Sequence, residues 1–291
     1  MYKYCAVKFN RGTGLGNKLF PWARCVVYAK KNKCRILKVN WIQLRKASFI
    51  AGGIDYKVSL GKILLAGNFI PSNAQLSVIE SFFVKIFKTS KVKIFQGDGN
   101  FFDDLRAERD FIKTSLISIT NRRTLNKISK YKNFPIVLNI RRGKDFKDPQ
   151  SELDFLNEGG IRTPLSWFKN TLTDIRMFSG KDYPALVVSD GTEDDLKELL
   201  MLSNITLAKT DKAIADLLLL SQAKVLLGSG GSSFSAWGSF LSKAITLTIP
   251  GQNLQWFKIS NETNDHLVDV YDPREQKKEI LEKIKVVLDK I

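Results

Sequence analysis

Two adjacent arginines follow a short apolar stretch in the segment Pro135–Phe146, which reads PIVLNIRRGKDF. Consecutive side chains of a strand point to opposite faces, so one of Arg141 and Arg142 should project into a crevice at the carboxyl end of the strand and the other toward a neighbouring loop. A guanidinium placed there can bind a phosphate group through two parallel hydrogen bonds. The alternative is a pair of solvated charges at a strand end.

A second candidate is Gly228–Ser235, GSGGSSFS, which follows an apolar strand and opens a predicted helix. Glycines let the backbone come close to a ligand, while helix N-terminal N–H groups and serine hydroxyls donate hydrogen bonds to phosphate. A helix N-cap in a tight turn would use some of the same residues. Three glycines and four serines in this stretch exceed what a cap requires, so we expect a phosphate-binding loop.

Two further motifs are less specific. Asp190 ends the segment VVSD and could accept hydrogen bonds from a nucleotide base or ribose, or cap the helix predicted near Glu193. Gly12–Asn17, GTGLGN, is not a dinucleotide fingerprint because Asn17 stands at the third glycine position, and it is not a P-loop because Leu19 replaces the Ser or Thr. We expect it either to bring backbone to a cleft or to form a structural turn.

Metal-dependent transfer would need close carboxylates to hold a cation on a diphosphate. The pair Asp103 and Asp104 and the run Glu193–Asp195 are candidates by composition, but both are typical of solvated helix starts. His266 is the only histidine, and no cysteine or histidine pair has ligand spacing, so no zinc site is expected. The sequence therefore predicts no metal and no cofactor.

The elements that must position these residues alternate along the chain. Strands are predicted at residues 4–9, 35–39, 136–140, 185–189, 224–227 and 244–249, and helices at 18–32, 101–119, 166–178, 193–202, 211–221, 233–241 and 273–291. Such alternation predicts an α/β protein with parallel sheets. We expect a domain over 1–130, a second over 131–272, each long enough for its own core, and a C-terminal helix over 273–291, opened by Pro273, that packs back on the body. The cleft between the two domains is the expected site.

Charge is divided unevenly over the 291 residues. Residues 1–134 carry 26 Lys+Arg against 7 Asp+Glu, a net +19, whereas residues 135–291 carry 20 against 22, a net −2. The basic part should meet an anionic partner, namely an acidic membrane surface, a phosphorylated substrate or nucleic acid, unless it is a generic basic surface. The three cysteines predict reduced thiols in a cytosolic protein. The start MYKYCAVKF predicts no leader, and the short apolar runs predict no membrane span.

Four segments in order carry a resemblance to a known family. They are GLGNKLFPWA at Gly14–Ala23, NIRRGKDF at Asn139–Phe146, VVSD at Val187–Asp190 and DLLLLSQAKVLLGSGGSSFSAWGSFL at Asp216–Leu241. With them the chain resembles the bacterial α-1,2-fucosyltransferases of the GT-B superfamily. The resemblance implies two Rossmann-like domains that face a central cleft, and metal-independent transfer from GDP-fucose with inversion at the sugar carbon.

The resemblance also implies roles for single residues. Arg141 would clamp the β-phosphate of the donor and stabilise the GDP leaving group. Asn139, Arg142 and Asp190 would contact the donor, with Asp190 facing guanine. Ser232, Ser233 and Phe234 would contact the diphosphate. Gly14, Gly16 and Asn17 would approach the donor from the first domain.

The chain departs from the family pattern at three places. Asn139 replaces a histidine at the base or ribose contact, Gly191 replaces a second aspartate, and Lys144 stands where an acidic residue should follow Gly143. Asp145, one position later, is a candidate for that place and for the base, but Asp148 and Glu152 also follow the arginine strand, so the base stays open among these three. Another GDP-linked or nucleotide-linked sugar therefore stays open as the donor.

The expected function is transfer of fucose to a glycan acceptor, lipid-pyrophosphate-linked, in bacterial surface polysaccharide (O-antigen or capsule) synthesis. The protein would be cytoplasmic and peripheral on the inner face of the inner membrane, held by its basic domain. The alternatives are a nucleic-acid-binding protein and a nucleotide-sugar-binding protein without turnover. Nucleic acid is disfavoured because aromatic residues are not interleaved with the basic ones, and because the phosphate-type loops lie in the half with net charge −2.

Overall fold

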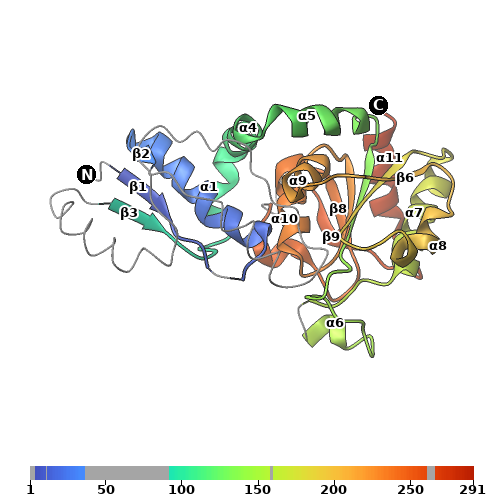
Figure 1. Cartoon of the computed structure of the whole chain (residues 1–291). Helices are drawn as coiled ribbons and strands as arrows, with labels where there is room; N and C mark the ends of the chain where they lie inside the picture. The colour runs from blue at the N-terminus through green and yellow to red at the C-terminus, as the bar shows by residue number, and fades with distance from the viewer. Residues whose placement is uncertain (1–3, 11, 37–91, 158–159, 261–265) are drawn as a thin grey trace.

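The computed structural model describes residues 4–10, 12–36, 92–157, 160–260 and 266–291, and it is an α/β protein with two parallel sheets (Figure 1). The first sheet has three described strands in the order β2-β1-β3, all parallel. The elements of this first unit are β1 (Tyr4–Val7), α1 (Leu15–Asn32), β2 (Arg35–Ile36), β3 (Val92–Phe95), η1 (Asp103–Glu108), α4 (Arg109–Ile119), α5 (Arg122–Ile128) and η2 (Ser129–Tyr131).

The second unit has a six-stranded sheet in the order β6-β5-β4-β7-β8-β9, again all parallel. Its elements are β4 (Ile136–Ile140), α6 (Asp154–Asn157), α7 (Leu165–Ser179), β5 (Ala185–Ser189), η3 (Asp194–Leu196), α8 (Lys197–Leu200), β6 (Ile205–Leu207), α9 (Ala213–Leu220), β7 (Val225–Gly228), α10 (Ser233–Ser242), β8 (Ile245–Thr248), η4 (Leu254–Phe257), β9 (Val268–Val270) and α11 (Lys278–Leu288).

The order of these strands reverses direction between β4 and β7. From β4 the chain adds β5 and β6 on one side, then returns to place β7, β8 and β9 on the other. In open parallel sheets the crevice outside such a reversal is where ligands bind, because the two connections leave toward opposite faces. Arg141 directly follows β4, and Ser229 directly follows β7.

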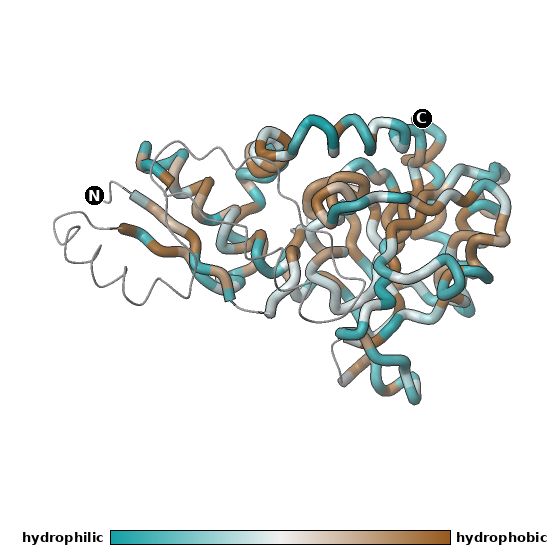
Figure 2. The backbone as a smooth tube through the Cα atoms, viewed as in Figure 1, coloured by the Kyte–Doolittle hydropathy of each residue, from teal (hydrophilic) through white to brown (hydrophobic). Residues whose placement is uncertain are grey.

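The central strands are buried on both faces, as near-continuous apolar strands of parallel sheets are. Leu138 of β4 packs in a cluster with Phe168 and Leu172 of α7 and Ile284 of α11. Val137, which points to the opposite face, belongs to the cluster formed with α9 and α10. Hydrophobic residues accordingly gather on α9 and α10, while α5 at the upper edge is mostly hydrophilic (Figure 2).

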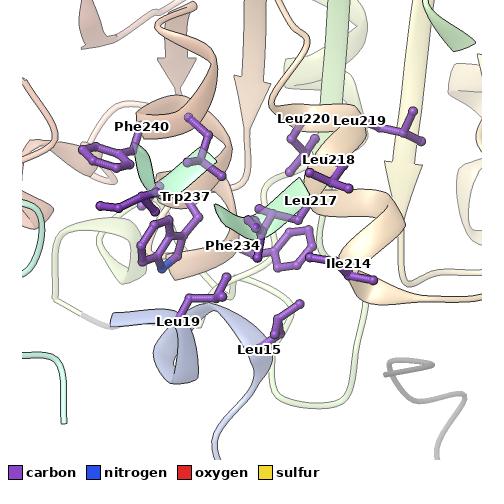
Figure 3. Close-up of a cluster of buried hydrophobic side chains, with 14 of the residues drawn as sticks. Leu15, Leu19, Ile214, Leu217, Leu218, Leu219, Leu220, Phe234, Trp237 and Phe240 are labelled. Carbon is purple, nitrogen blue, oxygen red and sulfur yellow. The ribbon is translucent and has the colours of Figure 1, made fainter. Parts of the chain in front are cut away.

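The apolar cluster on the α9–α10 face continues into the first unit. Leu15 and Leu19 of α1 lie against α10 (Figure 3), and Phe20 reaches Trp237 at a centroid distance of 5.1 Å. Phe102 stacks on Phe240 at 4.3 Å. The two units therefore share this cluster, while the second unit has a separate cluster between its sheet, α7 and α11, and the first has a small one around Cys5 and Cys25.

The class, the two parallel sheets and the C-terminal helix are confirmed, and several boundaries differ. Pro273 does not open the last helix, because Asp272 accepts a hydrogen bond from the Arg274 backbone in a turn and Gln276 has φ 44°, so α11 begins at Lys278. The helix predicted at 18–32 begins at Leu15, and the strand predicted at 35–39 is described only for Arg35–Ile36. The sequence missed β3, α5, α6, β6 and β9. The domain limits stay a prediction.

Among the described helices none has the length and hydropathy required to cross a bilayer.

Candidate functional site

Arg141 leaves β4 at the reversal point with its side chain buried. Its Nη2 donates to both carboxylate oxygens of Asp145, at 2.9 and 2.6 Å, and its Nη1 lies 3.4 Å from Oδ2 of Asp190. The guanidinium also lies over the Phe146 ring, 4.9 Å from its centroid. The Arg141 guanidinium is thus held by three neighbours, Asp145, Asp190 and Phe146.

Asp190, at the end of β5, holds the turn that carries the arginines. Its Oδ1 accepts from the Arg142 backbone N–H at 2.7 Å and its Oδ2 from that of Gly143 at 3.1 Å. The Arg162 guanidinium binds the same turn from the other side by donating to the Arg142 carbonyl at 2.8 Å. Burial first, and the neighbouring charge of Arg162 second, lower the pKa of the Arg142 side chain.

Three of the four serines in the Gly228–Ser235 loop bind the protein itself. Ser229 Oγ accepts from the Arg141 backbone at 2.9 Å, and Ser235 Oγ accepts from Nδ2 of Asn139 at 2.7 Å. Ser232 is the N-cap of α10, its hydroxyl accepting from the Ser235 N–H at 3.3 Å. The capping alternative therefore holds for Ser232, and Ser229 and Ser235 fasten α10 to the end of β4. The Ser233 hydroxyl has no partner within the described ranges and lines a pocket.

The start of α1 touches the start of α10. A Cβ placed on Gly16 would lie 2.5 Å from Ser233 Oγ and 3.0 Å from the Phe234 backbone nitrogen, so the two backbones approach as closely as glycine permits. The Trp237 indole donates to the Gly16 carbonyl at 2.8 Å. The first unit thus reaches the N-terminus of α10, where a helix has unsatisfied N–H groups and a partial positive charge.

Two pockets meet at Arg141 and Phe234. The inner pocket, of about 180 Å³, lies at the ends of β4, β5 and β6, and the cleft pocket, of about 370 Å³, lies between the two units. The inner pocket is lined by Asn139, Arg141, Val188, Ser189, Asp190, Gly191, Leu207, Ala208, Thr210, Lys212, Ala213, Asp216 and Phe234. The cleft pocket is lined by Gly14, Leu15, Gly16, Asn17, Asp98, Phe101, Arg141, Asp145, Phe146, Gly160, Gly231, Ser232, Ser233, Phe234, Trp256 and Phe257.

This arrangement suits an elongated anionic ligand. Arg141 supplies a fixed guanidinium and α10 its N-terminal N–H groups to the same cleft, which together can bind a diphosphate. The inner pocket beyond them combines polar side chains, among them Asn139 and Asp190, with apolar ones such as Val188, Leu207 and Phe234, and such a mixture can receive a nucleoside.

Comparison with known proteins gives structural likenesses only. No protein-family model and no curated protein matches the chain. The Bradyrhizobium α-1,6-fucosyltransferase NodZ, in a structure soaked with GDP-fucose, is similar at 11% identity over 86% of this chain and 96% of NodZ, with a TM-score of 0.46. POFUT1 in complex with GDP is similar at 11% identity over 85% and 99%, with a TM-score of 0.48. A variant of Arabidopsis thaliana FUT1 in complex with GDP is similar at 14% identity over 86% of this chain and 71% of FUT1, with a TM-score of 0.43. Likeness at this level leaves the activity to be inferred from the site of this chain.

The predicted site residues from both units line these two pockets, apart from Arg142. Gly14, Gly16 and Asn17 line the cleft pocket, as do Ser232 and Ser233. Arg142 contributes its backbone N–H to Asp190. Asp145, the candidate base, has a side chain 64% exposed and forms the ion pair with Arg141.

The sequence missed other residues of the site. Thr210, Lys212 and Asp216 line the inner pocket from the loop after β6 and the first turn of α9. No strand was predicted before Thr210, because β6 has only three half-buried residues, whereas Lys212 and Asp216 lie in the helix predicted at 211–221 and were not assigned to the site. Asp98 and Trp256 line the cleft pocket from segments that carry no motif; the glycines on both sides of Asp98 were the one available signal.

Two of the five acidic residues considered as metal ligands, Asp103 and Asp195, bind groups of the protein. Asp103 contacts Arg106 and accepts from Asn100 at 2.6 Å, and Asp195 accepts from the Thr192 backbone at 2.8 Å. Within the part of the chain that the structure describes, no group of three or more histidine, cysteine or acidic side chains is arranged to hold a metal ion.

Proposed function

We propose that this protein is an inverting glycosyltransferase that uses GDP-fucose as its donor. The observation that carries the proposal is the convergence of the buried Arg141 guanidinium and the N-terminus of α10 on one cleft at the strand-order reversal. A nucleoside diphosphate has two parts that need different surroundings, and the two pockets meeting at Arg141 supply them.

The nucleoside occupies the inner pocket in this proposal. Asn139 and Asp190 face the base or ribose, and Lys212 and Thr210 border the same space. Asp190 already binds two backbone N–H groups, so its contact with the base would use the remaining lone pairs of the carboxylate.

The diphosphate lies between Arg141 and the α10 N-terminus, near Ser232, Ser233 and Phe234. Negative charge develops on the departing diphosphate when the bond to the sugar breaks, and fixed donors stabilise that charge more strongly than mobile water does. A phosphate group would replace the exposed Asp145 carboxylate at Nη2 of Arg141, while Asp190 keeps the guanidinium in place. Arginine and helix N–H groups neutralise the diphosphate without a metal ion in this scheme.

The acceptor and location form the outer part of the proposal. The first unit, through Gly14, Gly16 and Asn17, borders the cleft from the side opposite the donor domain. We propose a glycan acceptor linked to lipid pyrophosphate in bacterial surface polysaccharide synthesis, at the inner face of the inner membrane. The net charge of +19 on residues 1–134, calculated from 26 basic and 7 acidic residues, supports contact with an anionic surface. The whole of the basic segment 37–91 lies outside the described residues.

A thermal-shift panel of GDP, GDP-fucose, UDP and CDP in the presence of EDTA tests the donor. GDP and GDP-fucose should raise the melting temperature, and Arg141→Ala should weaken GDP binding by roughly one to two orders of magnitude, since charge-assisted hydrogen bonds contribute about 1.5–3 kcal/mol. Arg141→Lys keeps the charge but loses the fork, so it should remain folded and bind weakly. Arg123→Ala, at an exposed position of α5, is the matched control. Stabilisation by UDP or CDP with none by GDP would contradict the donor assignment.

A further inference from the structure

The loop after β3 presents one carboxylate at the cleft. In the sequence QGDGNF, Asp98 stands between Gly97 (φ 65°) and Gly99 (φ 61°), both in the left-handed region that glycine adopts without strain. Phe101 N–H donates to the Asp98 carbonyl at 3.2 Å and closes the turn. Asp98 thereby lies at the carboxyl end of a parallel strand, the edge at which ligands bind.

This loop is fixed from both units. Arg24 of α1 donates to the Gln96 carbonyl at 3.0 Å and to the Gly97 carbonyl, and its guanidinium fills the space that a Cβ on Gly99 would need. On the other side Lys258 binds the Asn100 side chain. A group held in this way keeps its position when a substrate binds.

The Asp98 carboxylate is half-buried and lines the cleft pocket that also contains Arg141 and Asp145. It accepts no hydrogen bond within the described part of the chain, which sets it apart from Asp145 and Asp190, both paired to Arg141. Burial raises the pKa of Asp98, and the positive charge of Arg24 offsets part of that rise. A carboxylate with spare acceptor capacity and a raised pKa is suited to take a proton.

Trp256 is exposed in the same pocket. Its side chain is 53% exposed, although it packs on Phe257 at a centroid distance of 3.8 Å and on the edge of Phe101 at 5.1 Å. An indole ring held by two other rings and left open to a cleft gives a flat apolar platform. The C–H face of a sugar ring is flat and apolar as well, so the two surfaces match.

We propose that Asp98 and Trp256 form the acceptor subsite, with the sugar ring on Trp256 and its attacking hydroxyl hydrogen-bonded to Asp98. This inference rests on the proposed function. The hydroxyl oxygen bonds to the anomeric carbon, the bond from that carbon to the phosphate oxygen breaks with its electron pair going to the leaving GDP, and the hydroxyl proton passes to Asp98. Arg141, which lines the same pocket, stabilises the leaving group.

The test follows GDP release from GDP-fucose with and without a panel of methyl glycosides as acceptor probes. Asp98→Asn should lower the rate at least a hundredfold, as loss of a general base does, and leave the thermal shift with GDP unchanged. The control Asp110→Asn, at an exposed position of α4, should match the wild type. Trp256→Ala should raise KM for the glycoside tenfold or more at nearly constant kcat, and Trp256→Phe should recover most of the loss.

A pH profile separates a catalytic role of Asp98 from a structural one. The rate should fall as the pH drops through the raised pKa of Asp98, and this acidic limb should vanish in Asp98→Asn. The charged groups around Asp98 are Arg24 from α1, Asp104 of η1 acting through Arg24, and Arg141 and Asp145 across the pocket. An acidic limb that persisted in Asp98→Asn would contradict the assignment of Asp98 as the base.

The outcomes distinguish the two proposals. If the wild type transfers the sugar and Asp98→Asn does so at a rate within threefold of it, Asp98 is not the base. The GDP-fucose assignment is then left intact. The tryptophan fluorescence of Trp256 is obtained as the difference between the wild type and Trp256→Phe. The subsite is overturned if no methyl glycoside accelerates GDP release and none changes this difference. A wild type that binds no GDP removes the proposed function and this inference with it.

Discussion

Replacing Gly16 by alanine tests the contact between the two units. The added Cβ would lie 3.0 Å from two backbone atoms of α10, Ser233 C and Phe234 N, and 2.5 Å from Ser233 Oγ. Backbone at a helix start cannot yield without moving the helix, and such overpacking costs about 1–3 kcal/mol. Lengthening the hydrogen bond from Trp237 to the Gly16 carbonyl should lower the free energy of unfolding by a further amount of about 1 kcal/mol. The better helix propensity of alanine should raise it by at most about 1 kcal/mol.

We therefore expect Gly16→Ala to lower the free energy of unfolding by about 2 kcal/mol in urea titrations. Gly14→Ala is the matched control, because no atom lies within 4 Å of its Cβ, and it should cost well under about 1 kcal/mol at the α1 N-cap. Adding Ser233→Ala to Gly16→Ala removes the nearest clashing atom, so the double variant should be more stable than additivity predicts. Equal stability of the two glycine variants, or strict additivity, would refute the close approach of α1 and α10.

Two further predictions concern the buried carboxylate of Asp190 and the half-buried thiol of Cys34. Asp190→Ala leaves the Arg142 and Gly143 backbone N–H groups without their acceptor, so unfolding should become easier by about 2–4 kcal/mol in urea; a loss below about 1 kcal/mol would contradict the holding role. Burial and the Cys5 thiol raise the pKa of Cys34 to about 11, so its thiolate fraction at pH 8 is only about a thousandth. Iodoacetamide labelling of Cys34, followed by mass spectrometry, should accelerate about tenfold per pH unit up to pH 10, and a plateau below pH 9 would contradict this pKa.

The second unit was readable from sequence because its signals are local. The strand Ile136–Ile140 is an apolar run ended by two arginines, and the helix that begins at Ser233 is announced by a glycine and serine loop. Parallel-sheet topology then requires both features to lie at the same edge. The sequence therefore predicted that Arg141 and the α10 N-terminus lie in one crevice.

The remaining parts of the site depend on contacts between distant segments. Strand β3 has the half-exposed burial of an edge strand and is read as a basic segment, so nothing indicated that Asp98 follows a strand end. The pairing of Asp190 with the turn after β4 joins residues 48 positions apart, and no local pattern distinguishes such an acceptor from a helix cap. Asp145 was one of three acidic residues that could be the base from their position after the arginine strand, and its ion pair with Arg141 is visible only in three dimensions.

The apolar cluster that runs from α1 into α10 has a consequence for how the protein would admit the proposed substrates. Hinge closure separates and rejoins two lobes, and it is favoured where the contact between them is small and polar. Here a swing of the first lobe would strip Leu19 and Phe20 from Trp237 and expose all three to water. The cleft is therefore better described as a rigid slot whose width is set at folding, with any gating confined to the side chains and loops at its mouth.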